Sequence, residues 1–423
     1  MDSTDEHIVQ RPGHRRLGRT ELVFITAMLM ALHALAIDGM LPAIDEIAGE
    51  LGALDANDRQ LIVGVFLLAS GAGTLAPGLL ADRFGRKRLL MISLASFVVF
   101  GFACAFAQTF TQMIVLRGLQ GFFSAGLMVL PGAIIRDQFE GDSMARVFSL
   151  ISAVFITVPV IAPSIGQLVL YVAGWRWIFI GLGVMGLAMT AWAWIRMPET
   201  LHSEYRQEIV PRVLLRNMYI SVTSRAAIGY VLGTSLVIGT VFGYVNSAQQ
   251  LVGEHFGAGD MFPYVFGATA ATMAVASIVN SRIVEKFGAR RVSHAGLIAF
   301  IAISALQVWV SHSSHSNQIE WFLPLMAANL ALLGFLGANF GSIAMQPFAE
   351  IAGAAASIQA FIRMFGASVI GIAIGQAYDD TARPLAWSLL LAASLALLLI
   401  LYSERGKLFR RLHARPPERS HDI

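Results

Sequence analysis

Three ionisable side chains interrupt the long apolar stretches of this 423-residue chain: Asp38, Arg117 and Arg363. Asp38 lies about 17 residues into the first apolar stretch, and no other acid is near it there. A charged side chain inside a membrane is costly, so it is a functional candidate by default. Protonation removes that cost, so Asp38 is a candidate proton carrier. The alternative is that Asp38 lies near an outer mouth and is merely solvated.

Arg117 and Gln120 occur together in the fourth apolar stretch. On one interpretation, Arg117 is a structural base that snorkels or binds helix carbonyls. On the other, Arg117 and Gln120 lie near Asp38 and tune its proton affinity, because an opposite charge nearby favours the ionised carboxylate. A bundle that moved Arg117 relative to Asp38 would then couple protonation to conformation.

A basic turn, Gly78–Arg88, joins two apolar stretches, and a weaker copy, Asn280–Arg291, follows 203 residues later. The bases alone would anchor the membrane topology, and Gly85 suits a tight turn. An acid placed just before them can instead pair with a base or a helix N-terminus of the other half. We therefore expect a cytoplasmic gate, in one state only, at Gly78, Asp82, Arg83, Gly85 and Arg86. The second copy is the better candidate for a relic of duplication.

Polar and large side chains in the second half form a candidate substrate pocket, which Met30 of the first stretch would join. Few polar anchors in an apolar cavity suit a small lipophilic molecule, although each alone is more often a link between helices. The second-half residues are Phe242, Tyr244, Asn246, Gln249, Asn329, Asn339, Gln359 and Arg363. Arg363 is either a counter-ion for an acid or a direct contact for an anionic or carbonyl-bearing substrate.

Several other functions are excluded by the sequence. His33 and Asp38 fit an H-x4-D acyltransferase pattern, but residues five apart diverge on an α-helix. No phosphate-binding G-x-x-x-x-G-K-[ST] loop is present, and the basic tails lack aromatic residues for nucleic acid. The single Cys104 excludes an intrachain disulfide and a cysteine-based metal cluster. We expect no enzyme activity, no cofactor, no metal and no nucleic-acid partner.

The elements that must position these residues are membrane helices. The chain is 56% hydrophobic and 13% charged, and apolar windows of about 20 residues can span a bilayer. Twelve such windows predict an all-α membrane protein with two six-helix pseudo-symmetric bundles. We expect an N-tail (1–20), a first bundle (21–196), a linker (197–224), a second bundle (225–403) and a C-tail (404–423).

Basic residues gather in the two tails and in alternate loops, whereas the opposite loops are acidic or neutral. The positive-inside rule therefore places both termini in the cytoplasm. The first apolar stretch is too long, and the N-terminus too polar, for a cleaved signal peptide. We expect a multi-pass protein of a bacterial inner membrane that contacts the lipid bilayer and functions as a monomer.

Six motifs along the chain form a recognisable set: Gly78–Arg88, Ile114–Gly121 with its Arg117, Ala162–Gly166, Ile37–Ile44, Gly174–Phe179 and Met197–Leu201. They resemble the major facilitator superfamily, specifically drug:proton antiporters of the bicyclomycin/chloramphenicol-resistance (Bcr/CflA) type. The resemblance covers the whole chain; the first two motifs are specific to the superfamily, and the others narrow the resemblance to drug exporters.

The resemblance implies an exporter of small lipophilic drugs that is driven by protons and alternates access between its two halves. Pro159, Pro163 and Gly166 would then form the antiporter hinge, although Pro and Gly also make fixed packing kinks. Gln167, Gln359 and Arg363 depart from the usual pattern. An exporter of one endogenous metabolite is therefore the alternative, and a transporter-like receptor without flux is a further one.

Overall fold

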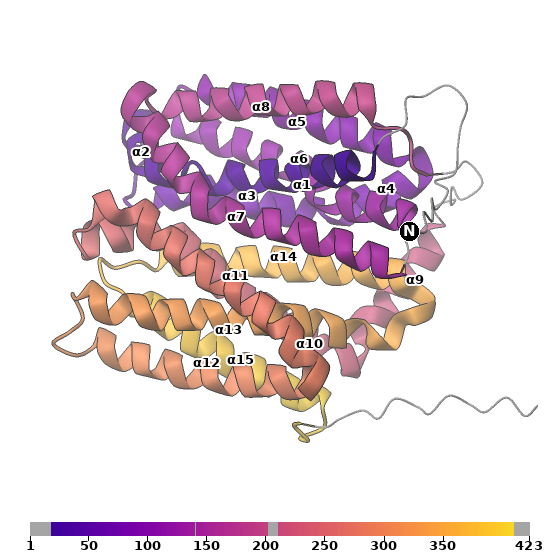
Figure 1. Ribbon diagram of the computed structural model, residues 1–423. Coiled ribbons are helices and arrows are strands. Elements are labelled where there is room, and N and C mark those ends of the chain that lie inside the picture. The colour runs from indigo at the N-terminus through magenta and orange to yellow at the C-terminus, as the bar shows by residue number, and fades with distance from the viewer. Residues whose placement is uncertain (1–17, 140, 202–209, 410–423) are drawn as a thin grey trace, which may run out of the picture.

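The computed structural model is built of helices joined by short turns (Figure 1), and it describes residues 18–139, 141–201 and 210–409. No β-strand occurs within these ranges. The tail residues 1–17 and 410–423, which include most of the basic residues expected there, lie outside the described residues. The first half contains α1 (Arg19–Asp38), η1 (Leu41–Ala43), α2 (Ile44–Leu51), η2 (Asp58–Gln60), α3 (Leu61–Gly73), α4 (Leu75–Phe84), α5 (Arg86–Ala105), α6 (Phe110–Gln138), α7 (Gly141–Ala173) and α8 (Trp175–Arg196).

The second half repeats this succession after a linker that contains a helix of its own. Its elements are α9 (Pro211–Thr223), α10 (Arg225–Gln250), η4 (Leu251–His255), η5 (Gly259–Met261), α11 (Phe262–Phe287), α12 (Ala289–Ser311), α13 (Ile319–Met345), η6 (Gln346–Ile351), α14 (Ala352–Gln376) and α15 (Arg383–Ser403). The sequence predicted no helix in the linker. Helix α9 packs on α14, where Gln359 Nε2 donates to Ser221 Oγ at 3.2 Å.

Nine helical segments among the described residues are long and apolar enough to cross a membrane. One of them, Ile319–Gln376, contains both α13 and α14 and supplies two crossings. Helices α3 and α4 form a further crossing with a 42° bend, and α7 contributes the apolar segment Thr157–Ala173. These segments account for the twelve crossings, and the predicted all-α, twelve-helix membrane fold is confirmed.

The bundle has two ends, which we name by what they carry. The terminal face carries the α4–α5 turn and α9, whereas the distal face carries α2 (Figure 1). The contacts of Arg59 with Asp45 and Glu254 place η2 and η4 on the distal face with α2. Gly85 and Gly288 begin equivalent turns on the terminal face, with φ of 98° and 83°. This backbone region strains residues that have a Cβ, so glycine allows α4 and α11 to end and the next helix to start at once.

The two halves meet along two pairs of helices. Gly64 and Gly71 of α3 let α14 approach closely, at Ile372 and at the backbone of Phe365. The second pair is α7 and α11, where the backbone of Val160 lies against Gly267. Figure 1 shows α7 and α11 close at the distal end and diverging toward the terminal face. Inter-half packing by α7 and α11 is therefore concentrated on the distal side.

Candidate functional site

Asp38 is the last residue of α1 and lies within the first membrane crossing, Thr20–Leu51. It is 7% exposed. Among the described residues, none forms a hydrogen bond or ion pair with its carboxyl group. The structure therefore contains a buried acid at the end of α1 that has no direct partner among the described residues, and a bound proton would remove the free-energy cost of burying its charge.

The peptide that follows Asp38 is in direct contact with α7. A Cβ added at Gly166 would clash with the carbonyl oxygen of Gly39, so only glycine permits this crossing of α1 and α7. Helix α7 runs without interruption through Pro159 and Pro163, and Pro163 is buried. The residues expected to form a hinge thus lie on the helix that touches the neighbour of Asp38.

Arg117 is fully buried in α6 and is held by acceptors on three helices. Its Nη2 donates to the carbonyl of Ala36 on α1 at 2.9 Å, and its Nε donates to the carbonyl of Ile62 on α3 at 3.2 Å. Its Nη1 donates to Gln120 Oε1 at 2.7 Å. Arg117 therefore lies beside the turn of α1 that ends in Asp38, but it is bound to carbonyls rather than paired with an acid.

The first basic turn is held by Asp82 and Asp137 of its own half and by Glu199, just after α8. Arg86 Nη1 lies 2.5 Å from Asp82 Oδ1, and Arg86 Nε donates to Asp137 Oδ2 at 3.0 Å. The Glu199 carboxylate accepts from the backbone N–H groups of Arg86 and Lys87 at 2.8 and 3.2 Å. It also occupies the space that a Cβ on Gly85 would need.

The remaining residues of the expected gate, Arg83 and Gly78, contact their neighbours without forming ion pairs to any residue that the structure describes. Arg83 stacks over the Phe84 ring at 5.3 Å. Gly78 faces both its own half, at Val129, and Ser357 of α14. The polar contacts that the structure gives this turn thus come from the first half and the start of the linker, and the expected pairing of Asp82 with the other half stays a prediction for another state.

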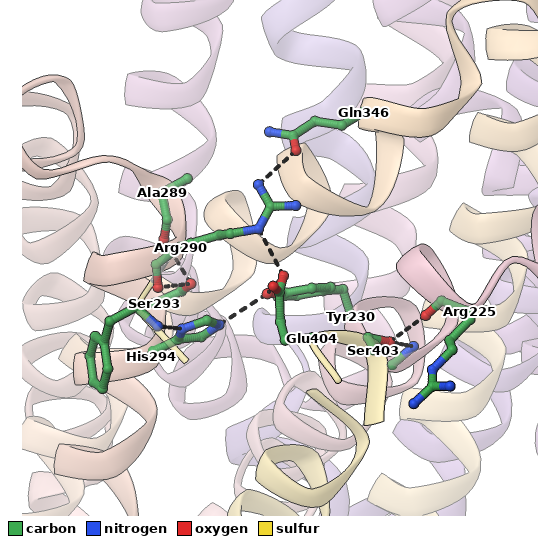
Figure 2. Close-up of polar contacts among 11 residues, drawn as sticks. Arg225, Tyr230, Ala289, Arg290, Ser293, His294, Gln346, Ser403 and Glu404 are labelled. Atoms are coloured by element: carbon green, nitrogen blue, oxygen red, sulfur yellow. Dashed lines mark hydrogen bonds and ion pairs between the residues drawn. The ribbon is translucent and has the colours of Figure 1, made fainter. Parts of the chain in front are cut away.

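The second basic turn has its own acid, Glu404, at the end of α15 (Figure 2). Glu404 Oε1 accepts from Arg290 Nε and from Tyr230 Oη, both at 2.7 Å. Burial alone would raise the pKa of the Glu404 carboxyl, but these two bonds outweigh it and hold the pKa below its usual range. His294 joins the cluster, because its Nε2 lies 3.0 Å from Tyr230 Oη and its Nδ1 accepts from the Phe409 N–H.

On the distal face, the described residues form six hydrogen bonds between the halves. Arg59 of η2 binds Glu254 of η4 with two parallel bonds of 2.6 and 2.8 Å, and Arg59 also pairs with Asp45 at 2.7 Å. Asn57 donates to the carbonyls of Gln376 and Tyr378, while Gln376 Nε2 donates to the Asn57 carbonyl. A bond between Gln60 and Gln250 completes the set. We call these contacts the distal latch.

Five residues of the expected pocket have partners inside the second half or pack there. The partners are Thr269 for Tyr244, Ser304 and Gln307 for Asn329, Asn280 for Asn339, Ser221 and the Ala344 carbonyl for Gln359, and the Gly371 backbone for Phe242. Met30 is half-buried against the main hydrophobic core. These side chains link helices in this conformation.

Asn246, Gln249 and Arg363 are different from the rest of the expected pocket. Asn246 Oδ1 and Gln249 Oε1 are buried without a hydrogen-bond partner, and Asn246 lies beside Gly64 and Gly375 at the boundary between the halves. Arg363 has no hydrogen bond or ion pair within the described part of the chain. These three are the expected pocket residues with free polar groups.

Sequence reasoning missed the distal latch and the acids that hold the basic turns. Nothing local in the sequence identifies the partner of Arg59. A signal did exist for the acids. Glu199 and Glu404 are 205 residues apart, which nearly equals the 203-residue offset of the turns they bind.

Comparisons with known proteins place this geometry in a family. The model of the Major Facilitator Superfamily matches residues 24–371. The chain is 26% identical over 378 residues to a bicyclomycin resistance protein homolog of Haemophilus influenzae, covering 88% of this chain and 93% of that one. It is 27% identical over 386 residues to the multidrug resistance protein MdtL of Escherichia coli, covering 90% and 94%.

Two solved structures share the fold at 14% identity. A bacterial homolog of the human lysosomal transporter Spinster, inward-facing and unoccupied, has a TM-score of 0.66 and covers 92% of this chain and 95% of its own. A D-xylose–proton symporter has a TM-score of 0.69, with coverages of 92% and 98%. The resemblance found in the motifs is thus confirmed, and the chain belongs to the Major Facilitator Superfamily, as a membrane transporter and not an enzyme.

Proposed function

We propose that this chain is a proton-coupled antiporter that exports small lipophilic drugs or toxic compounds across a bacterial inner membrane by alternating access. The relatives named for bicyclomycin and multidrug resistance support the direction and the class of substrate. One observation carries the coupling to protons: Asp38 is buried in a membrane crossing and has no partner among the described residues. A carboxyl group in that position is most stable when protonated, and it must lose the proton when a charge or substrate arrives.

The terminal face would be cytoplasmic. It carries Arg83, Arg86, Lys87 and Arg88 at the first basic turn and Arg290 at the second, whereas acids such as Asp45 and Glu254 lie on the distal face. Because basic loops stay in the cytoplasm, the distal latch would close the periplasmic side. The chain would then alternate by opening this latch while the cytoplasmic ends of the two bundles (21–196 and 225–403) approach each other.

Each residue group has a distinct role in this cycle. Asp38 would carry the proton, while Arg117 and Gln120 would fix the turn of α1 on which it lies. Gly166, with Pro159 and Pro163, would transmit movement of α7 to the peptide beside Asp38. Asn246 and Gln249 would offer free polar groups to the substrate.

The proton gradient can supply the work. A membrane potential contributes about 2.3 kcal/mol per charge per 100 mV. One proton entering per neutral drug leaving could therefore sustain roughly a 50-fold drug gradient at 100 mV, since 1.36 kcal/mol corresponds to a factor of ten.

A susceptibility panel tests the proposal. The chain is expressed in a bacterium that lacks its own exporters, and resistance to unrelated antibiotics and dyes is compared with that of Asp38→Asn. Purified protein in proteoliposomes then reports substrate uptake driven by an imposed pH difference. We expect resistance and proton-driven uptake with the unaltered chain and neither with Asp38→Asn.

Glu285→Gln provides the matched control, because Glu285 is an exposed acid of α11 and its loss should change nothing. Full proton-driven antiport by Asp38→Asn would contradict the assignment of Asp38. Resistance to a single compound only, among many tested, would favour a dedicated exporter of one metabolite.

A further inference from the structure

Arg363 lies near the middle of α14 and points into the second half rather than toward lipid. Residues four, seven and eleven positions apart share a face of an α-helix, so Arg363 shares the face of Ala367, Ile370 and Ile374. Ile370 and Ile374 pack into the space left by Gly239 and Gly243 of α10. The outward side of α14 is instead marked by exposed residues such as Val369.

The guanidinium group lies against a gap in the facing helix. Its Nη1 would be 3.7 Å from a Cβ added at Gly341 of α13, so the glycine leaves room beside it. Arg363 is nevertheless partly exposed, as is Gly341. The side chain thus combines an inward direction with some remaining exposure.

No acid of the second half is placed to neutralise Arg363. The described acids of that half all lie at helix ends or in connections: Glu254, Asp260, Glu285, Glu320, Glu350, Asp379, Asp380 and Glu404. Gln359, one turn before Arg363, already donates to Ser221 and to the Ala344 carbonyl. The counter-ion interpretation of Arg363 therefore has no partner in this conformation.

The membrane interior is also positive overall. Arg117 has no acid partner, and Asp38 is the one buried acid among the described residues. When Asp38 is protonated, both positive charges are left without a compensating negative charge. A fixed cation in this environment attracts a negative group that arrives with the substrate.

We propose that Arg363 binds an anionic group of the substrate, a carboxylate or sulfonate attached to an apolar body. This inference rests on the proposed function and narrows its substrate class. Arg can donate two parallel hydrogen bonds to such a group. Exchange of one proton for one monoanion would move two charges per cycle, so transport would respond more steeply to membrane potential than export of a neutral compound.

Two fluorescent probes with one skeleton provide the test. 8-Anilino-1-naphthalenesulfonate is anionic, and N-phenyl-1-naphthylamine is its neutral counterpart without the sulfonate. Uptake of each into proteoliposomes is driven by a pH difference and then by a potassium diffusion potential with valinomycin. We expect Arg363→Gln to slow uptake of the anionic probe by about tenfold or more and to leave the neutral probe unchanged.

Arg363→Lys, which keeps the charge, should retain part of the anionic uptake, and unchanged uptake of the neutral probe by Arg363→Gln shows that this variant is folded. Equal uptake of the anionic probe by Arg363→Gln and the unaltered chain would overturn the inference. Transport of the neutral probe alone by the unaltered chain would also overturn the inference. The proposed function would stand in both cases. If neither probe nor any other compound moved with protons, the proposed function would fail and this inference with it.

Discussion

Breaking the distal latch should shift the protein toward a state that is open on its distal face. Glu254→Gln removes the charge that joins η4 to η2 and keeps the size of the side chain. Arg59 keeps Asp45 as its partner within the first half, so no cation is left alone. The substitution therefore weakens a contact between the halves without stranding a charge inside one of them.

The size of the shift follows from the geometry of the pair. Hydrogen bonds to charged groups contribute about 1.5–3 kcal/mol, and parallel bonds to a carboxylate are among the strongest. The Arg59 side chain is 13% exposed and that of Glu254 is 42% exposed, so solvent screens part of the interaction. We expect a net loss of about 1–2 kcal/mol, which multiplies the ratio of open to closed molecules by roughly 5 to 30.

Distances between spin labels measure this ratio. Leu54 is fully exposed in the first half and Met261 is 58% exposed in the second, so cysteines at these positions label the two sides of the distal face. The single native cysteine, Cys104, is buried. Pulsed electron spin resonance should show a longer distance component that grows in Glu254→Gln.

Glu50→Gln is the matched control. Glu50 also pairs with an arginine near the distal face, at 2.5 Å, but its partner Arg176 is in the same half. The control should leave the distance distribution unchanged, because its ion pair survives when the halves separate. The reasoning is refuted if Glu254→Gln leaves the distribution unchanged, or if Glu50→Gln widens it equally.

Three further outcomes are expected. Gly166→Ala forces α1 and α7 apart at the peptide after Asp38, so it should lower stability by about 1–3 kcal/mol and displace the pH profile of uptake. Gly181→Ala, with open space around it, should do neither. An unshifted profile in Gly166→Ala would show that the α1–α7 contact does not influence Asp38. Arg117→Lys keeps the charge but cannot supply the three donors to Ala36, Ile62 and Gln120, so the melting temperature should fall clearly. An unchanged melting temperature would show that Arg117 does not hold these helices together. Because the pKa of Glu404 is lowered in the folded protein, the ionised Glu404 stabilises the fold above its unfolded pKa, near 4.5, and this contribution is lost as pH falls through the folded pKa. Glu404→Gln should therefore lower the melting temperature at pH 7 and flatten the decline of the melting temperature on acidification. A decline as steep as in the unaltered chain would argue against this contribution of Glu404.

Helix positions could be predicted from sequence because the requirement for a membrane crossing is local. About 20 apolar residues in a row satisfy it wherever they occur, and a bound such as α8 ending at Arg196 follows from composition alone. The bend between α3 and α4 and the helix α9 within the linker were not predicted. Both depend on packing, since α9 is held by α14 through Ser221 and Gln359.

The partners of the charged residues could be predicted only in part. That Arg117 and Asp38 are buried followed from their place in apolar stretches. The sequence could not predict that Arg117 binds the carbonyls of Ala36 and Ile62, because every helix offers carbonyls and only the packing of α1, α3 and α6 selects these two. The repeat of the basic turn was visible, but its acids come from the ends of α8 and α15, far away in the sequence.

The two faces of the bundle differ in what would hold them closed. At the first basic turn, Arg86 satisfies Asp82 and Asp137 within one half, so separating the halves on that side costs none of these bonds. On the distal face, opening breaks the two Arg59–Glu254 bonds and the contacts of Asn57. The conformation seen here is therefore the one that the fixed polar contacts favour. In the proposed cycle, a substrate or proton bound near Asp38 would supply the free energy that opens the latch, and a ligand can shift this balance only by its difference in affinity for the two states.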